Sequence, residues 1–217
     1  MLPAILYRDP DIAILDKPSG LAVHPGPKTP HSLEDLLPAL AKSQAARHFT
    51  PVAAHRLDRD TSGCIAIACS RRGARALSAA FAGGGAEKVY WAILSALPAA
   101  SEGLIDAPLK KISSAQAGWR MVVAADGQRA RTAWRVLDAG ARLVEFRPET
   151  GRTHQIRVHA AHIGCPISGD PVYGDGAGQL RLHARRLAIS LPDGRRIQAE
   201  APLPADWQAF DHAPGNR

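Results

Sequence analysis

The sequence predicts an α+β fold: a mixed, mainly antiparallel sheet with inserted helices. Apolar and polar residues alternate over 87–96, as expected for a strand with one buried face. Residues 134–137 and 142–147 are strand-like segments separated by Asp-Ala-Gly-Ala, which predicts a hairpin. Apolar residues recur at helical spacing over 70–81 and are followed by three glycines, which predicts a helix with a defined end.

The earlier elements follow from similar local signals. Residues 12–15 form a short apolar strand that ends at the Lys-Pro-Ser-Gly turn of 17–20, and a loop rich in proline and glycine covers 24–30. Ser32, with acidic residues just after it and leucines at helical spacing, predicts the start of a helix. The apolar run 64–69 predicts a buried strand.

The later elements place residues of interest on defined faces. In the strand over 87–96, alternation puts Lys88 and Tyr90 on the same face. Thr153 is predicted to cap a helix that ends near Gly164. The pattern as a whole predicts one domain over residues 1–210, and the last residues, 211–217, lack core-forming side chains and are expected to form a flexible tail.

The charge of the chain favours a polyanionic partner. Lys and Arg number 27 against 20 acidic residues, a formal net charge of +7, which suits contacts with nucleic-acid phosphates. A solvated charged face is an equally good explanation for any single basic cluster. The clustered basic residues are Arg71, Arg72, Arg75, Lys110, Lys111, Arg129, Arg131, Arg181, Arg185 and Arg186.

Cysteine usage and hydropathy predict a soluble cytoplasmic protein. The three cysteines, Cys64, Cys69 and Cys165, are scattered and form no Cys-x-x-Cys pair, which favours a reducing compartment. The first residues do not resemble a signal peptide, and no apolar run approaches the thickness of a bilayer. No membrane association is therefore expected.

The segment 55–63, His-Arg-Leu-Asp-Arg-Asp-Thr-Ser-Gly, surrounds a carboxylate with cations. Asp58 lies between Arg56 and Arg59, and a nearby opposite charge keeps a carboxylate ionised at neutral pH. An ionised Asp can act as a nucleophile. Asp followed by Thr-Ser-Gly is also typical of an ordinary turn, so the segment alone leaves both interpretations open.

This segment resembles the second motif of the RluA-type pseudouridine synthases, His-Arg-Leu-Asp-x-x-Thr-Ser-Gly. Segments 16–24, 88–92 and 151–159 resemble further motifs of that family, in the family's order, and the similarity covers about residues 5 to 205. The resemblance implies the pseudouridine synthase catalytic fold. The sequence resembles the short form of the family, which has no N-terminal S4 domain.

The resemblance implies an RNA-modifying isomerase. It would convert specific uridines to pseudouridine in structured RNA, a stem-loop of tRNA or rRNA. A cleft completed within one chain predicts a monomer. No cofactor is expected, because the sequence has no dinucleotide-binding turn, P-loop or Gly-x-Ser-x-Gly elbow. A catalytically inactive RNA-binding or chaperone module is the alternative, and a metal-dependent RNA hydrolase is a distant third.

By resemblance, Asp58 is the catalytic carboxylate, Arg157 is its ion-pair partner and Tyr90 lies against the uracil. Asp58 would attack the ribose, attack the base or assist glycal formation, and the sequence leaves all three routes open. A core tyrosine is the alternative for Tyr90, and a surface helix arginine is the alternative for Arg157. We expect Asp60 to cap the backbone donors of Thr61 and the following serine.

The same motifs supply the expected substrate-binding residues. Arg56 would fill the space left by the flipped uridine, since its planar guanidinium stacks well; its alternative is pairing with a neighbouring Asp. Leu182 would lie under the base, with core packing an equal alternative. The full predicted substrate-binding set is Arg56, Lys88, Thr61, His154, Ile156 and Leu182.

No metal site is predicted. His154, His159 and His162 lie close together in sequence, but their spacing does not align them as ligands and the cysteines are not grouped. His154 is expected to form hydrogen bonds that support the cleft.

Overall fold

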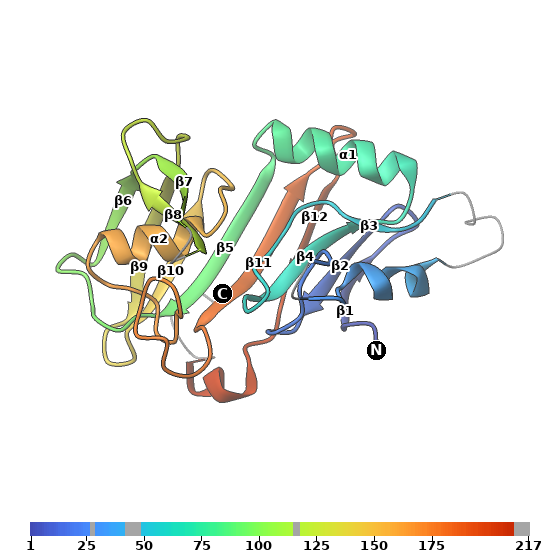
Figure 1. The fold of residues 1–217 in the computed structure, drawn as a ribbon. Coiled ribbons are helices and arrows are strands. Elements are labelled where there is room, and N and C mark those ends of the chain that lie inside the picture. The colour runs from blue at the N-terminus through green and yellow to red at the C-terminus, as the bar shows by residue number, and fades with distance from the viewer. Residues whose placement is uncertain (27–28, 42–48, 115–117, 211–217) are drawn as a thin grey trace. The chain divides into compact units, whose positions relative to one another are not determined.

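The computed structural model describes residues 1–26, 29–41, 49–114 and 118–210, and the expected tail 211–217 lies outside this part. The chain divides into two compact units (Figure 1). Unit 1 comprises residues 1–88 and 184–202, and unit 2 comprises residues 89–183 and the chain from Leu203 onward. That 1–210 act as one catalytic domain stays a prediction.

Unit 1 is built on a sheet with the strand order β1-β2-β4-β11. The pairs β1–β2, β2–β4, β3–β4 and β11–β12 are antiparallel. Its strands are β1 (Ile5–Arg8), β2 (Ile12–Lys17), β3 (Val52–Ala53), β4 (Ser62–Ala68), most of β11 (Leu182–Ser190) and β12 (Arg196–Glu200). Its helices are the 3-10 helix η1 (Glu34–Leu40) and α1 (Arg71–Ala82).

The core of unit 1 joins α1 to the sheet. Leu77 and Ala80 of α1 pack in one cluster with Ile12, Ile14 and alternate residues of β4. Ser70 caps the helix, because its side chain accepts a hydrogen bond from the amide of Gly73. The predicted strands over 12–15 and 64–69 and the predicted helix over 70–81 are therefore confirmed to within a few residues.

Unit 2 is built on an antiparallel sheet with the order β5-β10-β9-β6. The strands are β5 (Ala86–Ile93), β6 (Glu102–Asp106), β9 (Arg131–Asp138) and β10 (Leu143–Pro148). β7 (Leu109–Ser114) and β8 (Gly118–Val123) pair as a separate two-stranded hairpin. The helices are α2 (Gln155–His162) and the 3-10 helix η3 (Ala205–Phe210).

The two faces of β5 contribute to two different clusters. Val89 and Trp91 pack with Leu143, Leu203 and Trp207. Tyr90 and Ala92 belong instead to the cluster that contains Ile156 and Ala160 of α2. The alternation predicted for this strand is confirmed, and the hairpin predicted around residues 138–143 is present as β9 and β10. The α+β fold class with a mainly antiparallel sheet is thus correct.

Two local predictions need correction. The helix predicted from Ser32 is a 3-10 helix that begins at Glu34 and contains Pro38, which has no N–H to donate within a helix. The cap predicted at Thr153 is wrong, because His154 occupies the N-cap position in the left-handed conformation, with φ 54° and no side-chain cap bond. No helix in the described ranges is long and apolar enough to span a lipid bilayer.

Steric crowding explains why the HRLDRDTSG segment ends in a glycine, Gly63. Gly63 has φ 103°, and a Cβ placed there would lie 2.3 Å from the carbonyl oxygen of Ala184 in β11. No side chain fits this approach, since contacts of that length require the backbone to move. The residue that ends the motif therefore lets β4 lie directly against its neighbour.

Replacing Gly63 with alanine should destabilise the protein by about 3 kcal/mol, because left-handed strain adds to the clash with backbone. Gly84→Ala is the matched control: Gly84 has φ 73°, but its Cβ would meet nothing within 4 Å. Gly84→Ala should lower the free energy of unfolding by only about 1–2 kcal/mol. Urea unfolding of both variants measures the difference, and equal losses would contradict the packing argument.

Candidate active site

His55 holds the start of the Asp58 loop against β4. Its Nε2 accepts a hydrogen bond of 3.0 Å from the amide of Ala66, and its ring packs 4.9 Å from that of Phe81. Burial, reinforced by the charge of Lys88, lowers the pKa of His55 to about 4. The imidazole is therefore neutral at physiological pH, as its acceptor role requires.

Lys17 holds the other side of the same loop. Its ammonium is completely buried and donates three hydrogen bonds of 2.7–2.9 Å, to the carbonyls of Pro18, Leu21 and Arg59. Burial lowers its pKa to about 8, while the charges of Asp60, Asp58 and Asp16 act in the opposite direction. This lysine ties the end of β2 to the residue that follows Asp58.

Asp58 lies half-buried between these two attachments. Its carbonyl accepts a hydrogen bond of 3.1 Å from the amide of Thr61, which is buried. The expectation that Asp60 caps Thr61 is therefore wrong. The Asp60 carboxylate instead accepts from Nε and Nη2 of Arg59, at 2.9 and 3.1 Å. The adjacent cation competes successfully for the carboxylate because a charged donor binds it more strongly than an amide.

Arg56 and Lys88 complete the predicted residues of unit 1. Arg56 is exposed, and its guanidinium forms no ion pair within the described part of the chain. Pairing with a neighbouring Asp, the alternative considered for Arg56, is thus not observed there. Lys88 is half-buried on β5, and its pKa is lowered by burial. Roles in substrate binding stay predictions for Arg56, Lys88 and Thr61.

In unit 2, Arg157 forms a buried ion pair with Asp170. Its Nε and Nη2 donate to the two carboxylate oxygens at 2.7 and 2.8 Å, and both side chains are nearly inaccessible. Burial alone would raise the pKa of Asp170, but the bonds from Arg157 and from the amides of Val172 and Tyr173 lower it below its ordinary value. Arg157 is a buried helix residue and not a surface arginine.

The partner predicted for Arg157 was Asp58. Asp58 belongs to unit 1 and Arg157 to unit 2, and the relative placement of the units is not determined. Asp170 accepts from Nε and Nη2 of Arg157. The pairing of Arg157 with Asp58 therefore stays a prediction.

Tyr173 connects Arg157 to the β7–β8 hairpin. The Arg157 guanidinium lies 5.2 Å from the centre of the Tyr173 ring. The Tyr173 hydroxyl accepts from the amide of Met121 at 3.0 Å and lies 2.9 Å from Nδ1 of His154. His154 thus forms the kind of supporting hydrogen bond expected of it, and its contact with substrate stays a prediction.

A buried polar network fixes the entry to α2. Gln155 accepts from Thr150 and from the amide of Arg152, and it donates to the Arg131 carbonyl and to Thr132. Its side-chain amide is therefore fully satisfied. These bonds hold the chain that leads into α2 against β9.

His159, one of the three histidines considered as metal ligands, has both ring nitrogens in hydrogen bonds. Nδ1 lies 2.8 Å from the Thr132 hydroxyl and Nε2 lies 3.0 Å from the Ala107 carbonyl. Among the described residues, no three His, Cys, Asp or Glu side chains gather as a metal-binding group.

Tyr90, Ile156 and Leu182 lie together in unit 2. Ile156 and Leu182 are buried members of one apolar cluster, and Tyr90 is half-buried against it. This packing suits Ile156 and Leu182 as core residues that support the tyrosine ring. Direct contact of the three with a uracil stays a prediction.

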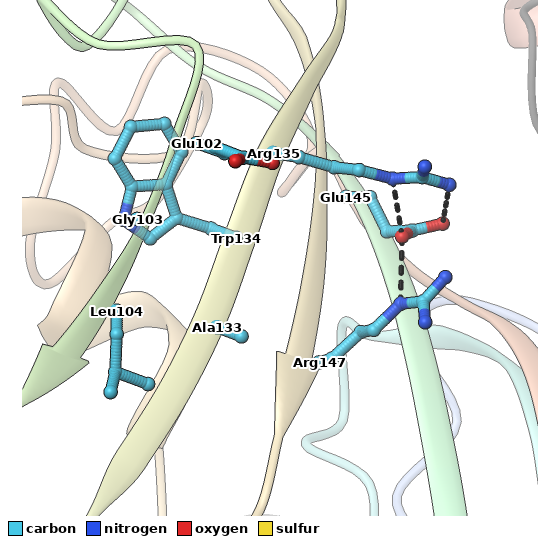
Figure 2. A pocket seen from close by; sticks show the side chains of 8 residues that line it. All are labelled: Glu102, Gly103, Leu104, Ala133, Trp134, Arg135, Glu145 and Arg147. Atoms are coloured by element: carbon cyan, nitrogen blue, oxygen red, sulfur yellow. Dashed lines mark hydrogen bonds and ion pairs between the residues drawn. The ribbon is translucent and has the colours of Figure 1, made fainter.

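A pocket of about 460 Å³ in unit 2 contains none of the predicted site residues. It lies on the β6-β9-β10 sheet, where the buried Glu145 carboxylate accepts from Nε of Arg135 and of Arg147, each at 2.8 Å (Figure 2). The Trp134 side chain lies against Gly103, where a Cβ would come within 3.0 Å of the indole. Its only carboxylates are Glu102 and the paired Glu145, so we do not assign it to catalysis.

Sequence reasoning missed Asp170, Tyr173 and the role of Lys17. Asp170 and Tyr173 belong to the segment 169–174, Gly-Asp-Pro-Val-Tyr-Gly, whose paired glycines and Asp-Pro step signal a tight turn. Gly169 has φ 73° and contacts the backbone of Gln179 closely. The presence of Asp170 and Tyr173 in this constrained turn was the sequence signal that could have identified them as site residues.

The neutral His55 predicts a pH dependence of stability. Its pKa is about 4 in the folded chain against an ordinary value of 6.5. Between these values the unfolded chain binds a proton that the folded chain does not, so stability falls as pH falls from 6.5 toward 4. Urea unfolding should show a loss of about 2 kcal/mol from this group between pH 7 and pH 5.

His55→Gln is the control, since an amide oxygen can accept from Ala66 without titrating. Its unfolding free energy should lack this contribution. A variant with the same pH dependence as the original chain would exclude His55 as its source.

Asp170→Asn should destabilise the protein by about 3–5 kcal/mol, because it leaves the buried Arg157 charge uncompensated. The control is Asp126→Asn, which removes an exposed ion pair with Lys110 and should change little. Urea unfolding at pH 7 compares them. Similar midpoints for the two variants would argue against the buried pair as an organising contact.

The described geometry can be compared with known proteins. The family model described as RNA pseudouridylate synthase matches residues 11–162. An uncharacterized RNA pseudouridine synthase of Zymomonas mobilis is 47% identical over 207 residues, covering 92% of this chain and 93% of that protein. The ribosomal large subunit pseudouridine synthase D of Xanthomonas campestris is 36% identical over 227 residues, covering 94% of this chain and 67% of that protein.

A solved structure agrees with these relatives. Human RNA pseudouridylate synthase domain containing 4 superposes with a TM-score of 0.77 at 28% identity, covering 96% of this chain and 92% of that one. The matched region contains the Asp58 loop, β5 and α2. The chain therefore belongs to the RNA pseudouridylate synthase family and is an RNA-modifying isomerase.

Proposed function

We propose that this protein isomerises specific uridines in a structured RNA, of tRNA or rRNA, with Asp58 as the catalytic carboxylate. In this reaction the bond between N1 of uracil and C1′ of ribose breaks, and a bond between C5 and C1′ forms. C5 loses its proton and N1 gains one, so atoms and electrons balance without an oxidant, a reductant or a cofactor.

The observation that carries this assignment is the attachment of the Asp58 loop on both sides. His55 binds the backbone of β4 before Asp58, and the buried Lys17 binds the Arg59 carbonyl after it. A reactive group held by buried hydrogen bonds loses little entropy on reaching the transition state. The backbone of Asp60 is also held, because its carbonyl accepts from the Ser19 hydroxyl at 2.8 Å, but its carboxylate is paired with Arg59. The position of Asp58 in the HRLDRDTSG motif then favours Asp58 of the two acids.

Arg157 is the proposed partner of Asp58. Its guanidinium is already oriented by two bonds to Asp170 and by the Tyr173 ring. A fixed cation beside the catalytic carboxylate would keep it ionised when the RNA excludes water, since burial otherwise favours the protonated acid.

Tyr90 and Arg56 are proposed to handle the base. Tyr90 offers its ring to the uracil from β5. Arg56 is exposed and can enter the base stack when the uridine leaves it, which offsets part of the unstacking cost. Lys88, Thr61, His154, Ile156 and Leu182 complete the proposed substrate-binding set.

The proposed RNA follows from charge and from one relative. The net charge of +7 suits phosphate contacts. The name of the Xanthomonas relative refers to the ribosomal large subunit, which makes large-subunit rRNA the first substrate to test, followed by tRNA. We further propose that the protein acts in the cytoplasm as a monomer. An inactive RNA-binding or chaperone module is the second candidate, supported by the charge alone.

The test measures tritium release from RNA that carries uridine labelled with tritium at C5. Asp58→Asn should abolish release while RNA binding, measured by filter retention, changes less than threefold. Asp60→Asn should retain most of the turnover. Loss of turnover in both variants would refute the choice of Asp58, and no release by the unmodified protein from rRNA or tRNA would favour the inactive module.

The substrate is identified in cells. Pseudouridines mapped in total RNA should lose one or a few positions when the gene is deleted, and these positions should return with the unmodified gene but not with Asp58→Asn. Unchanged maps would contradict the proposed activity.

A further inference from the structure

The β7–β8 hairpin carries an exposed tryptophan. The chain has four tryptophans. Trp91, Trp134 and Trp207 are buried, whereas Trp119 is 46% exposed. The large apolar surface of an indole is costly to leave in water, so an exposed indole on a defined strand is a candidate contact for a partner.

Trp119 is held in place by neighbours in unit 2. Its ring centre lies 5.0 Å from that of His154, with an angle of 32° between the planes. His154 in turn contacts the Tyr173 hydroxyl, which also accepts from the Met121 amide two residues beyond Trp119. The indole is thus oriented before any ligand arrives, which lowers the entropy cost of binding.

Lys111 adds a positive charge to the same face of the hairpin. Lys111 pairs with Met121 and Ser113 pairs with Trp119, so Lys111 and Trp119 are diagonal neighbours on one face. The Lys111 ammonium lies 4.9 Å from the centre of the indole ring. Residues 109–123 include three basic residues and no acidic one.

We propose that Trp119, with His154 and Lys111, forms a stacking platform for an unpaired nucleobase of the RNA substrate. This inference rests on the proposed function for its ligand, and it adds a binding site for a second base beside the target uridine. Base–aromatic stacking is stronger than an exposed cation–π contact. The base therefore displaces the flexible Lys111, whose ammonium then meets the phosphate.

The contacts link this platform to the proposed catalytic partner. Trp119 contacts His154, His154 contacts Tyr173, and Tyr173 contacts Arg157. A base stacked on Trp119 is thus held on the same group of contacting side chains that orients Arg157. Stacking is tolerant of sequence because every base has a π face, so the platform contributes affinity and register more than choice of base.

The experiment uses the complete protein and a hexamer of adenylate, which contains no uridine and needs no catalysis. Because Trp119 is exposed and Trp91, Trp134 and Trp207 are buried, stacking should quench the intrinsic fluorescence mainly through Trp119. Trp119→Ala should abolish the quenching and weaken binding of a fluorescein-labelled hexamer, measured by anisotropy, about 5- to 150-fold.

Two variants control for the fold of the hairpin. Trp119→Phe keeps an aromatic face and should bind the labelled hexamer within a few-fold of the unmodified protein. Ile112→Ala removes another exposed apolar side chain of β7, 39% exposed, and should bind normally. Equal weakening by Ile112→Ala and Trp119→Ala would mean that the hairpin had lost its fold or acts only as an apolar surface, and would overturn the platform.

The outcomes separate this inference from the proposed function. Normal hexamer binding by Trp119→Ala, with tritium release by the unmodified protein, refutes the platform and leaves the function standing. Quenching and weakened binding as predicted, without any tritium release from rRNA or tRNA, support the platform and refute the function.

Discussion

A charge removed from water must be surrounded by groups that replace its hydration, and in each unit the candidate site is organised around one such cation. In unit 1 the Lys17 ammonium satisfies its three donors with backbone carbonyls. In unit 2 Arg157 is bound by both oxygens of Asp170. Each buried cation is satisfied only when the loop that supplies its acceptors is in place. The cation therefore holds that functional segment in one position.

The two cations act on the candidate site in different ways. Lys17 donates all three of its hydrogen bonds to main-chain carbonyls. It therefore affects Asp58 by holding the neighbouring backbone at Arg59. Arg157 gives two nitrogens to Asp170, and its guanidinium plane is fixed by that bidentate contact. A planar, always-charged group suits this second role, whereas a lysine would supply a point charge without orientation.

Neutral polar groups complete the framework. His55 stays uncharged so that it can accept from β4, and Gln155 satisfies both its oxygen and its amide within the entry to α2. Fully satisfied networks of this kind specify one arrangement, because any displacement leaves a buried group without a partner. The aromatic contacts from Tyr173 to Trp119 extend the same ordering to the surface of the hairpin.

The sequence by itself determined the fold class, the strand and helix faces of residues 64–96, and the segment that contains Asp58, because these depend on periodicity and on residues adjacent in the chain. It did not predict that Asp170 binds Arg157 or that Lys17 reaches the Arg59 carbonyl. Local pattern also misjudged the Thr153 cap and the partner of Asp60. Those contacts join residues distant in sequence or depend on competition between donors, so only the tertiary structure decided them: burial selects, among several chemically possible partners, the one that leaves no charge or hydrogen bond unsatisfied.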